Sequence, residues 1–216
     1  MRNALKACFL ISIFLIPITS NGVHAETIQA GGADAWLDRP DNPRASLVLV
    51  PGQGGLSEND PLLRVRGEIA AKGFAVLSIG KTTNVRAAMR QMAQIAKPVY
   101  LAAVSQGVSR LGIMMSGGKF KTKGLVLIAG NLNFVRRKVQ EQRKLPRTLV
   151  IHHRSDDCSK TPPSAVSGFK DWGGDKVTVE WLDGGSSRGG ACGPNSHHGL
   201  SGLDAELVDA IANFLR

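Results

Sequence analysis

The chain of 216 residues lacks internal repeats and low-complexity linkers, and its length suits a single domain. Aromatic residues are scarce, at 5% of the sequence, and no basic stretch is interleaved with them. That interleaving is typical of nucleic-acid-binding surfaces, so its absence argues against such a partner despite a formal net charge of +10. Cysteine is also scarce: of the three residues, one lies close to the start of the chain.

The first 25 residues have the pattern of a secretory signal peptide. Arg2 and Lys6 supply the positive start, and residues 9–16 form an apolar core that is too short to span a bilayer. Ala25 ends a small-residue cleavage pattern. We therefore expect export to the periplasm or out of the cell, with residues 26–216 as a mature domain that has no membrane-spanning segment. The mature chain stays basic, a charge that suits anionic envelope polymers or lipid headgroups.

Beyond this segment, short apolar runs alternate with amphipathic stretches. An antiparallel pair is predicted first, at residues 27–29 and 33–37. Further strands are predicted from the apolar runs at residues 45–50, 74–79, 99–104, 125–129, 148–151 and 177–182. Helices are predicted from the helical spacing of apolar residues at 61–72, 85–96, 108–115, 164–172 and 203–215. Strands that alternate with helices imply an α/β fold, with a mostly parallel twisted sheet and helices on both faces.

A serine directly follows the predicted strand at 99–104 and precedes a predicted helix. Residues 103–107 are Ala-Val-Ser-Gln-Gly, which match the G-x-S-x-G pattern of a nucleophile elbow except that Ala103 replaces the first glycine. In that arrangement a tight strand-to-helix turn exposes the serine hydroxyl at a helix N-terminus. Ser105 is therefore a candidate nucleophile, and an ordinary helix-capping serine is the alternative.

A glycine-rich segment, residues 51–55, follows the predicted strand at 45–50. In open α/β sheets, sites form beyond the carboxyl ends of the strands. Glycines allow backbone N–H groups to approach an oxyanion closely. We expect the N–H groups of Gln53 and Gln106 to form an oxyanion hole, with a flexible glycine loop as the alternative interpretation.

Candidate acids and bases lie in two later loops. Asp156 and Asp157 follow the strand predicted at 148–151, where a triad acid would orient a histidine, although turn-forming aspartates have the same pattern. His197 and His198 precede the last predicted helix, and an imidazole with an ordinary pKa suits a general base; a surface histidine pair is the alternative. Serine, aspartate and histidine follow one another in the chain order of one known type of serine triad, which favours the functional interpretation.

These motifs resemble those of the α/β-hydrolase family over nearly all of residues 26–216. Residues 149–156, Leu-Val-Ile-His-His-Arg-Ser-Asp, are similar to the family's strand followed by H-G-x-x-D, which implies Asp156 as the acid. The tripeptide His198-Gly-Leu is similar to the family's H-G-F ending and implies His198 as the base. Residues 50–53 resemble the family's oxyanion turn. The chain departs from the family pattern at Pro51, Ala103 and His153.

The resemblance implies a serine hydrolase that cleaves a carboxylic ester, or an amide, of a small-molecule substrate without a cofactor. In that reaction Ser105 attacks the carbonyl carbon, His198 takes and returns the proton, and Asp156 orients His198. The alternative comes from another functional class: a non-catalytic protein of the cell envelope that keeps the fold for its binding surface.

Cys158 and Cys192 are the two cysteines of the expected mature chain. An even pair in an exported protein predicts a disulfide bond, which would join the loop of the candidate acid to that of the candidate base. The histidines, aspartates and cysteines of these loops also have the residue types of a metal site. Two cysteines in an oxidising compartment disfavour that interpretation, and we expect no metal.

The segment after the strand predicted at 125–129 is where many α/β-hydrolases insert a lid. Here it spans only residues 131–146 and is rich in basic side chains, namely Arg136, Arg137, Lys138, Arg143 and Lys144. One interpretation is a solvated surface helix. The other is a basic rim that guides anionic substrates toward Ser105. In both cases a short lid predicts an open site.

Overall fold

The computed structural model describes residues 22–118 and 121–216. Most of the predicted signal peptide, residues 1–21, lies outside the described residues. Strand β1 (Val23–Ala30) begins before the predicted cleavage position after Ala25, so that position falls within a strand. In the described ranges, no helix is long and apolar enough to cross a membrane.

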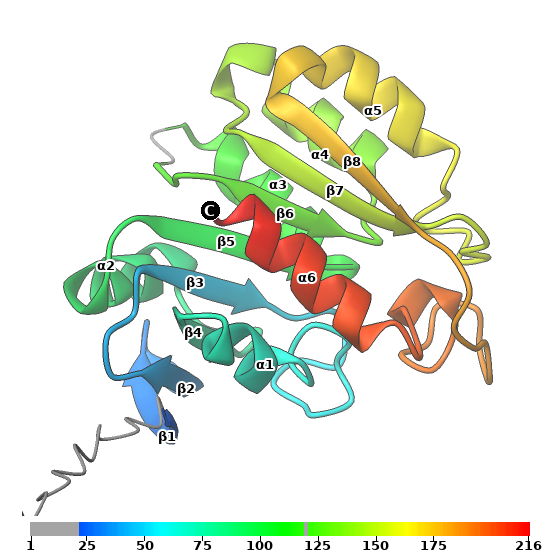
Figure 1. The fold of residues 1–216 in the computed structure, drawn as a ribbon. Helices are drawn as coiled ribbons and strands as arrows, with labels where there is room; N and C mark the ends of the chain where they lie inside the picture. The colour runs from blue at the N-terminus through cyan, green and yellow to red at the C-terminus, as the bar shows by residue number, and fades with distance from the viewer. Residues whose placement is uncertain (1–21, 119–120) are drawn as a thin grey trace, which may run out of the picture.

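Eight strands form one sheet in the order β1-β2-β4-β3-β5-β6-β7-β8 (Figure 1). Antiparallel pairing joins β1 to β2 and β2 to β4, whereas every other pair of neighbouring strands in this order is parallel. After β1 the strands are β2 (Ala33–Pro40), β3 (Ala45–Val50), β4 (Phe74–Ile79), β5 (Val99–Val104), β6 (Leu125–Ile128), β7 (Thr148–His153) and β8 (Val177–Leu182). The predicted α/β class with a mostly parallel sheet is confirmed.

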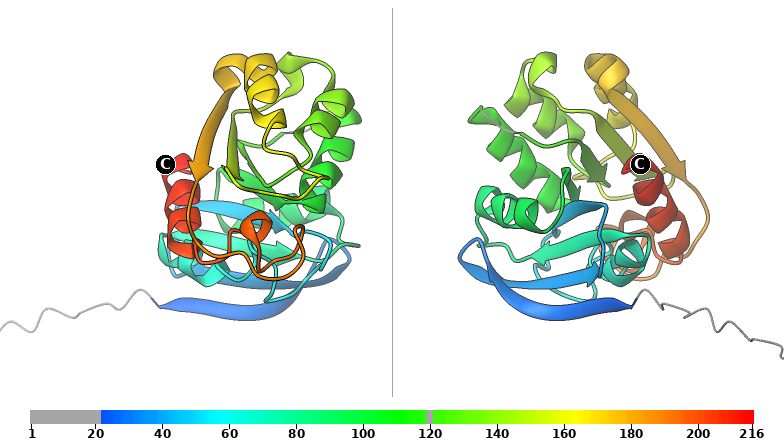
Figure 2. Two further views of the ribbon diagram at one scale, coloured as in Figure 1. Left: turned by 90° about the vertical axis from the view of Figure 1, so that its right-hand side faces the viewer. Right: turned by 60° about the vertical axis from the view of Figure 1, so that its left-hand side comes forward.

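Helices cover both faces of the sheet, as Figure 1 and Figure 2 show. On one face lie α1 (Arg66–Ala71) and α6 (Asp204–Phe214). On the other face lie α2 (Val85–Ile95), α3 (Gln106–Ser116), α4 (Leu132–Val139) and α5 (Ala165–Gly173). Short 3₁₀ helices complete the described structure at η1 (Gln142–Lys144), η2 (Gly174–Lys176) and η3 (His197–Gly199).

The central strands are buried on both faces because helices cover each side. In β3, Leu47 and Leu49 belong to the apolar cluster shared with α1 and α6, whereas Val48 and Val50 belong to the cluster shared with α2 to α5. This alternation follows from the two-residue period of a strand. Ser46 is the polar exception, and its hydroxyl donates to the carbonyl oxygens at positions 92 and 96 over 2.9 and 2.8 Å.

One predicted helix is much shorter than the sequence suggests. Apolar spacing predicts a helix over residues 61–72, but the α-helix begins only at Arg66. Asp60 caps the segment, because its Oδ1 accepts the backbone N–H groups of Leu62 and Leu63 over 3.0 and 3.2 Å, as an N-cap carboxylate does. The backbone hydrogen bonds that follow are irregular: the Arg64 N–H donates to the carbonyl oxygen four residues back, whereas the Arg66 N–H donates to the carbonyl oxygen three residues back. The apolar side chains of this segment are still buried. The apolar spacing therefore predicted correctly which side chains are buried, but the predicted helix was wrong over residues 61–65.

Candidate active site

Ser105 occupies a strained turn between β5 and α3. Its backbone has φ 51° and ψ −117°, a region that non-glycine residues rarely adopt. The turn also requires glycine at position 107, where an added Cβ would lie 2.5 Å from the carbonyl oxygen of Val50 and 2.6 Å from that of Pro51. Ala103, which replaces the first glycine of the motif, is fully buried in β5. The sequence Ser-Gln-Gly therefore forms a strained strand-to-helix turn that only glycine at its third position permits.

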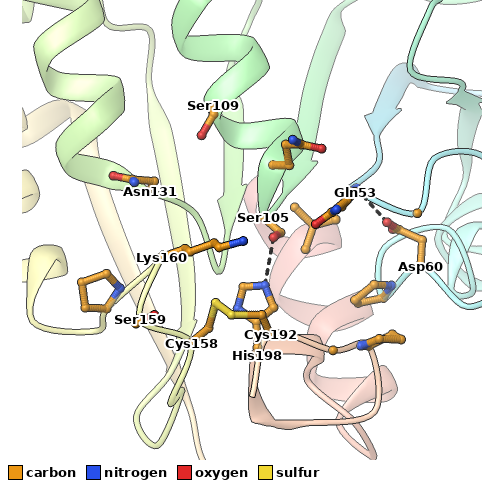
Figure 3. Close-up of a pocket in the computed structure, with 18 of the residues that line it drawn as sticks. Gln53, Asp60, Ser105, Ser109, Asn131, Cys158, Ser159, Lys160, Cys192 and His198 are labelled. Atoms are coloured by element: carbon orange, nitrogen blue, oxygen red, sulfur yellow. Dashed lines mark hydrogen bonds between the residues drawn. A yellow bond between two sulfur atoms is a disulfide. The ribbon is translucent and has the colours of Figure 1, made fainter. Parts of the chain in front are cut away.

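A row of hydrogen bonds connects Ser105 with His198 and Asp156. The Nε2 atom of His198 lies 2.9 Å from the Ser105 Oγ (Figure 3), and its Nδ1 lies 3.0 Å from the Asp156 Oδ2. Both His198 and Asp156 are buried, at 3% and 5% exposure. In this geometry His198 Nδ1–H donates to the carboxylate, which leaves Nε2 as the acceptor for the serine hydroxyl. The arrangement can remove a proton from Ser105 and stabilise the resulting imidazolium.

Asp157 and His197, the alternative acid and base, lie outside this hydrogen-bonded row. Asp157 is exposed and does not contact His198. The ring of His197 stacks on His153 at 4.3 Å between centroids, and its Nδ1 donates to the carbonyl oxygen of Ser155 over 3.1 Å. The structure therefore brings together the aspartate and the histidine that the family resemblance singles out.

Asp156 has further polar neighbours that hold its carboxylate. Its Oδ1 accepts the backbone N–H of Cys158 over 2.9 Å. The Thr161 hydroxyl lies 3.5 Å from Asp156 Oδ2 and 3.1 Å from His198 Nδ1. His152 packs against the same carboxylate, with its Nδ1 3.8 Å from Oδ2, and burial lowers the pKa of His152. No local sequence pattern points to Thr161, because its contact with His198 spans 37 residues.

The glycine-rich turn after β3 is held from two sides. Gly52 N–H donates to Asp60 Oδ2 over 2.8 Å, and the Lys81 ammonium donates to the carbonyl oxygen of Gln53 over 3.0 Å. Gln53 and Gln106 both line the pocket beside Ser105. Gln106 is the first residue of α3, where backbone N–H groups have no partner within the helix and the helix dipole favours negative charge.

Asp60 is a site residue that the sequence analysis missed. It is buried, and its two oxygens accept three backbone N–H groups in all. Burial raises the pKa of its carboxyl above the ordinary value, and these hydrogen bonds oppose that effect. The signal available in the sequence is the Asn-Asp-Pro turn at residues 59–61, directly after the glycine-rich segment.

A disulfide bond joins Cys158 to Cys192, as predicted, across a separation of 34 residues. It connects the loop after β7, which carries Asp156, to the loop before α6, which carries His198. Both cysteines line the pocket. Over residues 22–118 and 121–216, no group of three or more histidine, cysteine, aspartate or glutamate side chains is arranged to hold a metal ion.

The pocket above Ser105 has a volume of about 690 Å³. It opens at the carboxyl ends of the parallel strands, the edge that faces the viewer in the left panel of Figure 2. Most of its side chains are polar, and Figure 3 shows Lys160, Asn131 and Ser109 on the side of Ser105 opposite Asp60. The segment 131–146, predicted as a short lid, forms α4 and η1 and contributes Asn131, Asn133 and Arg137 to the lining.

No protein-family model matches the chain, and no curated protein matches it. Solved structures do match. Est1E from Butyrivibrio proteoclasticus aligns with a TM-score of 0.65 at 16% identity, over 88% of this chain and 97% of that one. The esterase domain of a Rhodothermus marinus protein aligns with a TM-score of 0.66 at 15% identity, over 89% and 97%. An alpha-beta serine hydrolase homologue from Coxiella burnetii aligns with a TM-score of 0.64 at 14% identity, over 89% and 97%. The chain therefore has the α/β-hydrolase fold.

Proposed function

We propose that this α/β-hydrolase-fold protein is a serine hydrolase that cleaves carboxylic esters of small molecules. The observation that carries the proposal is the continuous hydrogen-bonded row from Ser105 through His198 to Asp156, with the serine on a strained turn at the floor of a pocket. A helix-capping serine does not explain the row, because the Ser105 side chain caps no backbone group of α3.

The geometry supports a two-stage acyl transfer. Ser105 Oγ attacks the carbonyl carbon while its proton passes to His198 Nε2, and the Asp156 carboxylate stabilises the imidazolium. The backbone N–H groups of Gln53 and Gln106 stabilise the oxyanion of the tetrahedral intermediate. Collapse of the intermediate expels the alcohol with the proton from His198. A water molecule then attacks the acyl-enzyme by the same route and releases the carboxylic acid.

One of the matched structures is described as an esterase domain, which supports an ester rather than an amide as the substrate. Because the likeness to it is one of fold, the choice of ester rests on this proposal and on its test. We also propose that the protein acts outside the cytoplasm, in the periplasm or after secretion. The signal pattern and the disulfide bond both support export, since disulfides persist in oxidising compartments.

A fluorophosphonate probe tests the proposal, because it labels only an activated serine and requires no knowledge of the substrate. We expect the wild-type protein and Ser116→Ala to be labelled and Ser105→Ala to remain unlabelled. Ser116 is a matched control at the far end of the same helix, where its hydroxyl donates to a carbonyl oxygen. Hydrolysis of a short-chain ester by Ser105→Ala should fall about a thousandfold or more. A wild-type protein that does not react would instead support a non-catalytic envelope-binding protein.

The two adjacent histidines supply a second arm of the same experiment. His198→Ala should lose hydrolysis nearly as completely as Ser105→Ala, whereas His197→Ala should retain most of it, because only His198 contacts the serine. The reverse ranking would show that the general base is His197 and that the hydrogen-bonded row is not the catalytic one.

A further inference from the structure

Lys160 extends from the loop after β7 into the pocket. Figure 3 shows its ammonium group pointing toward Ser105, from the side opposite Asp60. Within the described residues, Lys160 has neither a carboxylate partner nor a hydrogen bond to its ammonium group. Its backbone position is restrained nevertheless, because Cys158, two residues earlier, is fixed by the disulfide and by its bond to Asp156. A cation therefore lines the same pocket as the nucleophile, without a counter-ion from the described residues.

The same wall of the pocket adds a second cation and a free amide. Arg137 of α4 lines the pocket, as does Asn131. The Asn131 Oδ1 accepts the backbone N–H of Phe134 over 2.9 Å, which leaves its side-chain NH₂ group to donate to a ligand. Among the described lining residues the one acidic side chain is Asp60, whose oxygens are already occupied by backbone N–H groups. The pocket therefore has an excess of positive charge and hydrogen-bond donors.

The apolar side chains of this pocket, apart from the disulfide, are small: they are Val104, Pro61, Pro162 and Pro194. Pockets that bind apolar ligands are lined mainly by aliphatic and aromatic side chains. Among the described residues, the lining therefore offers no leucine, isoleucine, methionine or phenylalanine against which a long acyl chain would pack.

We propose that the substrate is a small ester that carries an anionic group, a carboxylate or a phosphate, and that Lys160 binds this anion next to the scissile carbonyl, with Arg137 as the outer cation. This inference rests on the proposed hydrolase function. Lys160 is exposed, so its contribution comes from a direct charge-assisted hydrogen bond to an anion held within the pocket. Lys160 is in this scheme a specificity-determining residue, while the reacting atoms remain those of Ser105 and His198.

Pairs of esters that differ in charge and are otherwise close in structure test the inference. The carboxylate pair is monomethyl succinate and methyl succinamate. The phosphate pair is 2-acetoxyethyl phosphate and its neutral dimethyl ester. For each pair the readout is the ratio of kcat/KM for the anionic ester to that for the neutral one. In the wild-type protein we expect a ratio of about ten or more for at least one pair, the effect of one charge-assisted hydrogen bond. The pair with the larger ratio shows whether the bound anion is a carboxylate or a phosphate.

Substitutions test whether Lys160 causes the preference for the anionic ester. Lys160→Met should bring the ratio to within about twofold of one, and Lys160→Glu should invert it, because a carboxylate repels an anionic ester. Lys138→Met is the matched control, since it removes the same charge from α4 at a position outside the pocket lining. It should lower the ratio by less than about twofold, because an exposed charge at that distance is screened.

The outcomes separate this inference from the proposed function. Hydrolysis of the neutral esters that persists in Ser105→Ala would overturn the proposed Ser105-dependent mechanism itself. Hydrolysis that depends on Ser105 but shows no preference within either pair would overturn only the anionic substrate. A preference that Lys138→Met reduces as strongly as Lys160→Met would also overturn the inference, because it would then reflect the overall charge of the protein.

Discussion

Replacing Asp60 with asparagine is expected to slow turnover far more than it destabilises the fold. In the wild-type protein, Asp60 Oδ2 accepts the N–H of Gly52, whereas Oδ1 accepts two N–H groups from the turn that follows. An asparagine can keep the Oδ1 contacts with its carbonyl oxygen, but its NH₂ group then faces the N–H of Gly52. Asp60→Asn therefore removes one hydrogen bond at the turn that carries Gln53.

The two effects have different magnitudes. A buried N–H without an acceptor costs about 1–3 kcal/mol of stability. Burial raises the pKa of Asp60, so the ionised carboxylate itself destabilises the folded state at neutral pH, and a neutral amide recovers part of the loss. We therefore expect a stability change at the lower end of that range. Turnover has no such compensation: displacement of the Gln53 N–H removes one oxyanion donor, which costs about 10²–10³ in kcat.

Initial rates at saturating substrate measure kcat, and urea unfolding measures stability. Glu58→Gln is the matched control, because it makes the same carboxylate-to-amide change two residues away, at an exposed side chain paired with Arg66. It should leave kcat unchanged and alter stability by less than about 1 kcal/mol. A folded Asp60→Asn protein with wild-type kcat would refute the idea that Asp60 positions the oxyanion turn.

Two further predictions concern the histidine and acid loops. Cys192→Ser, or reduction of the disulfide, should lower the free energy of unfolding by roughly 3–4 kcal/mol in the chain-entropy model, because the Cys158–Cys192 bond spans 34 residues of the chain. The same change should slow hydrolysis, because this bond connects the loop of the acid to the loop of the base. A urea midpoint and a rate that reduction does not change would contradict this. Burial lowers the pKa of His152 in the folded protein. Below about pH 6.5 the unfolded chain therefore binds a proton at His152 that the folded chain does not, so the free energy of unfolding should fall as the pH drops. His152→Leu should flatten this slope in urea titrations at several pH values, and an unchanged slope would show that other groups cause it.

Local sequence patterns were sufficient for most of the fold. The strands predicted at residues 45–50, 74–79 and 177–182 match β3, β4 and β8 in both bounds. Each is a run of consecutive or alternating apolar residues bounded by turn residues, and burial of such runs depends little on the rest of the chain. The error at residues 61–65 concerns conformation alone: apolar spacing reports which side chains are buried, whereas the backbone there forms turns and not a regular helix.

Within the site, the sequence by itself determined the candidate serine and the two loops that could supply its partners, because strand exits on one edge of a parallel sheet converge. Residue type alone does not separate Asp156 from Asp157, or His197 from His198, and the resemblance to the family motifs implied Asp156 and His198. The tertiary structure supplies what a motif cannot, namely the distances that place these two side chains in one hydrogen-bonded row with Ser105, because a turn rotates successive side chains in different directions. The contacts of Asp60 and Lys160 were likewise decided in three dimensions, where segments distant in the chain form one pocket.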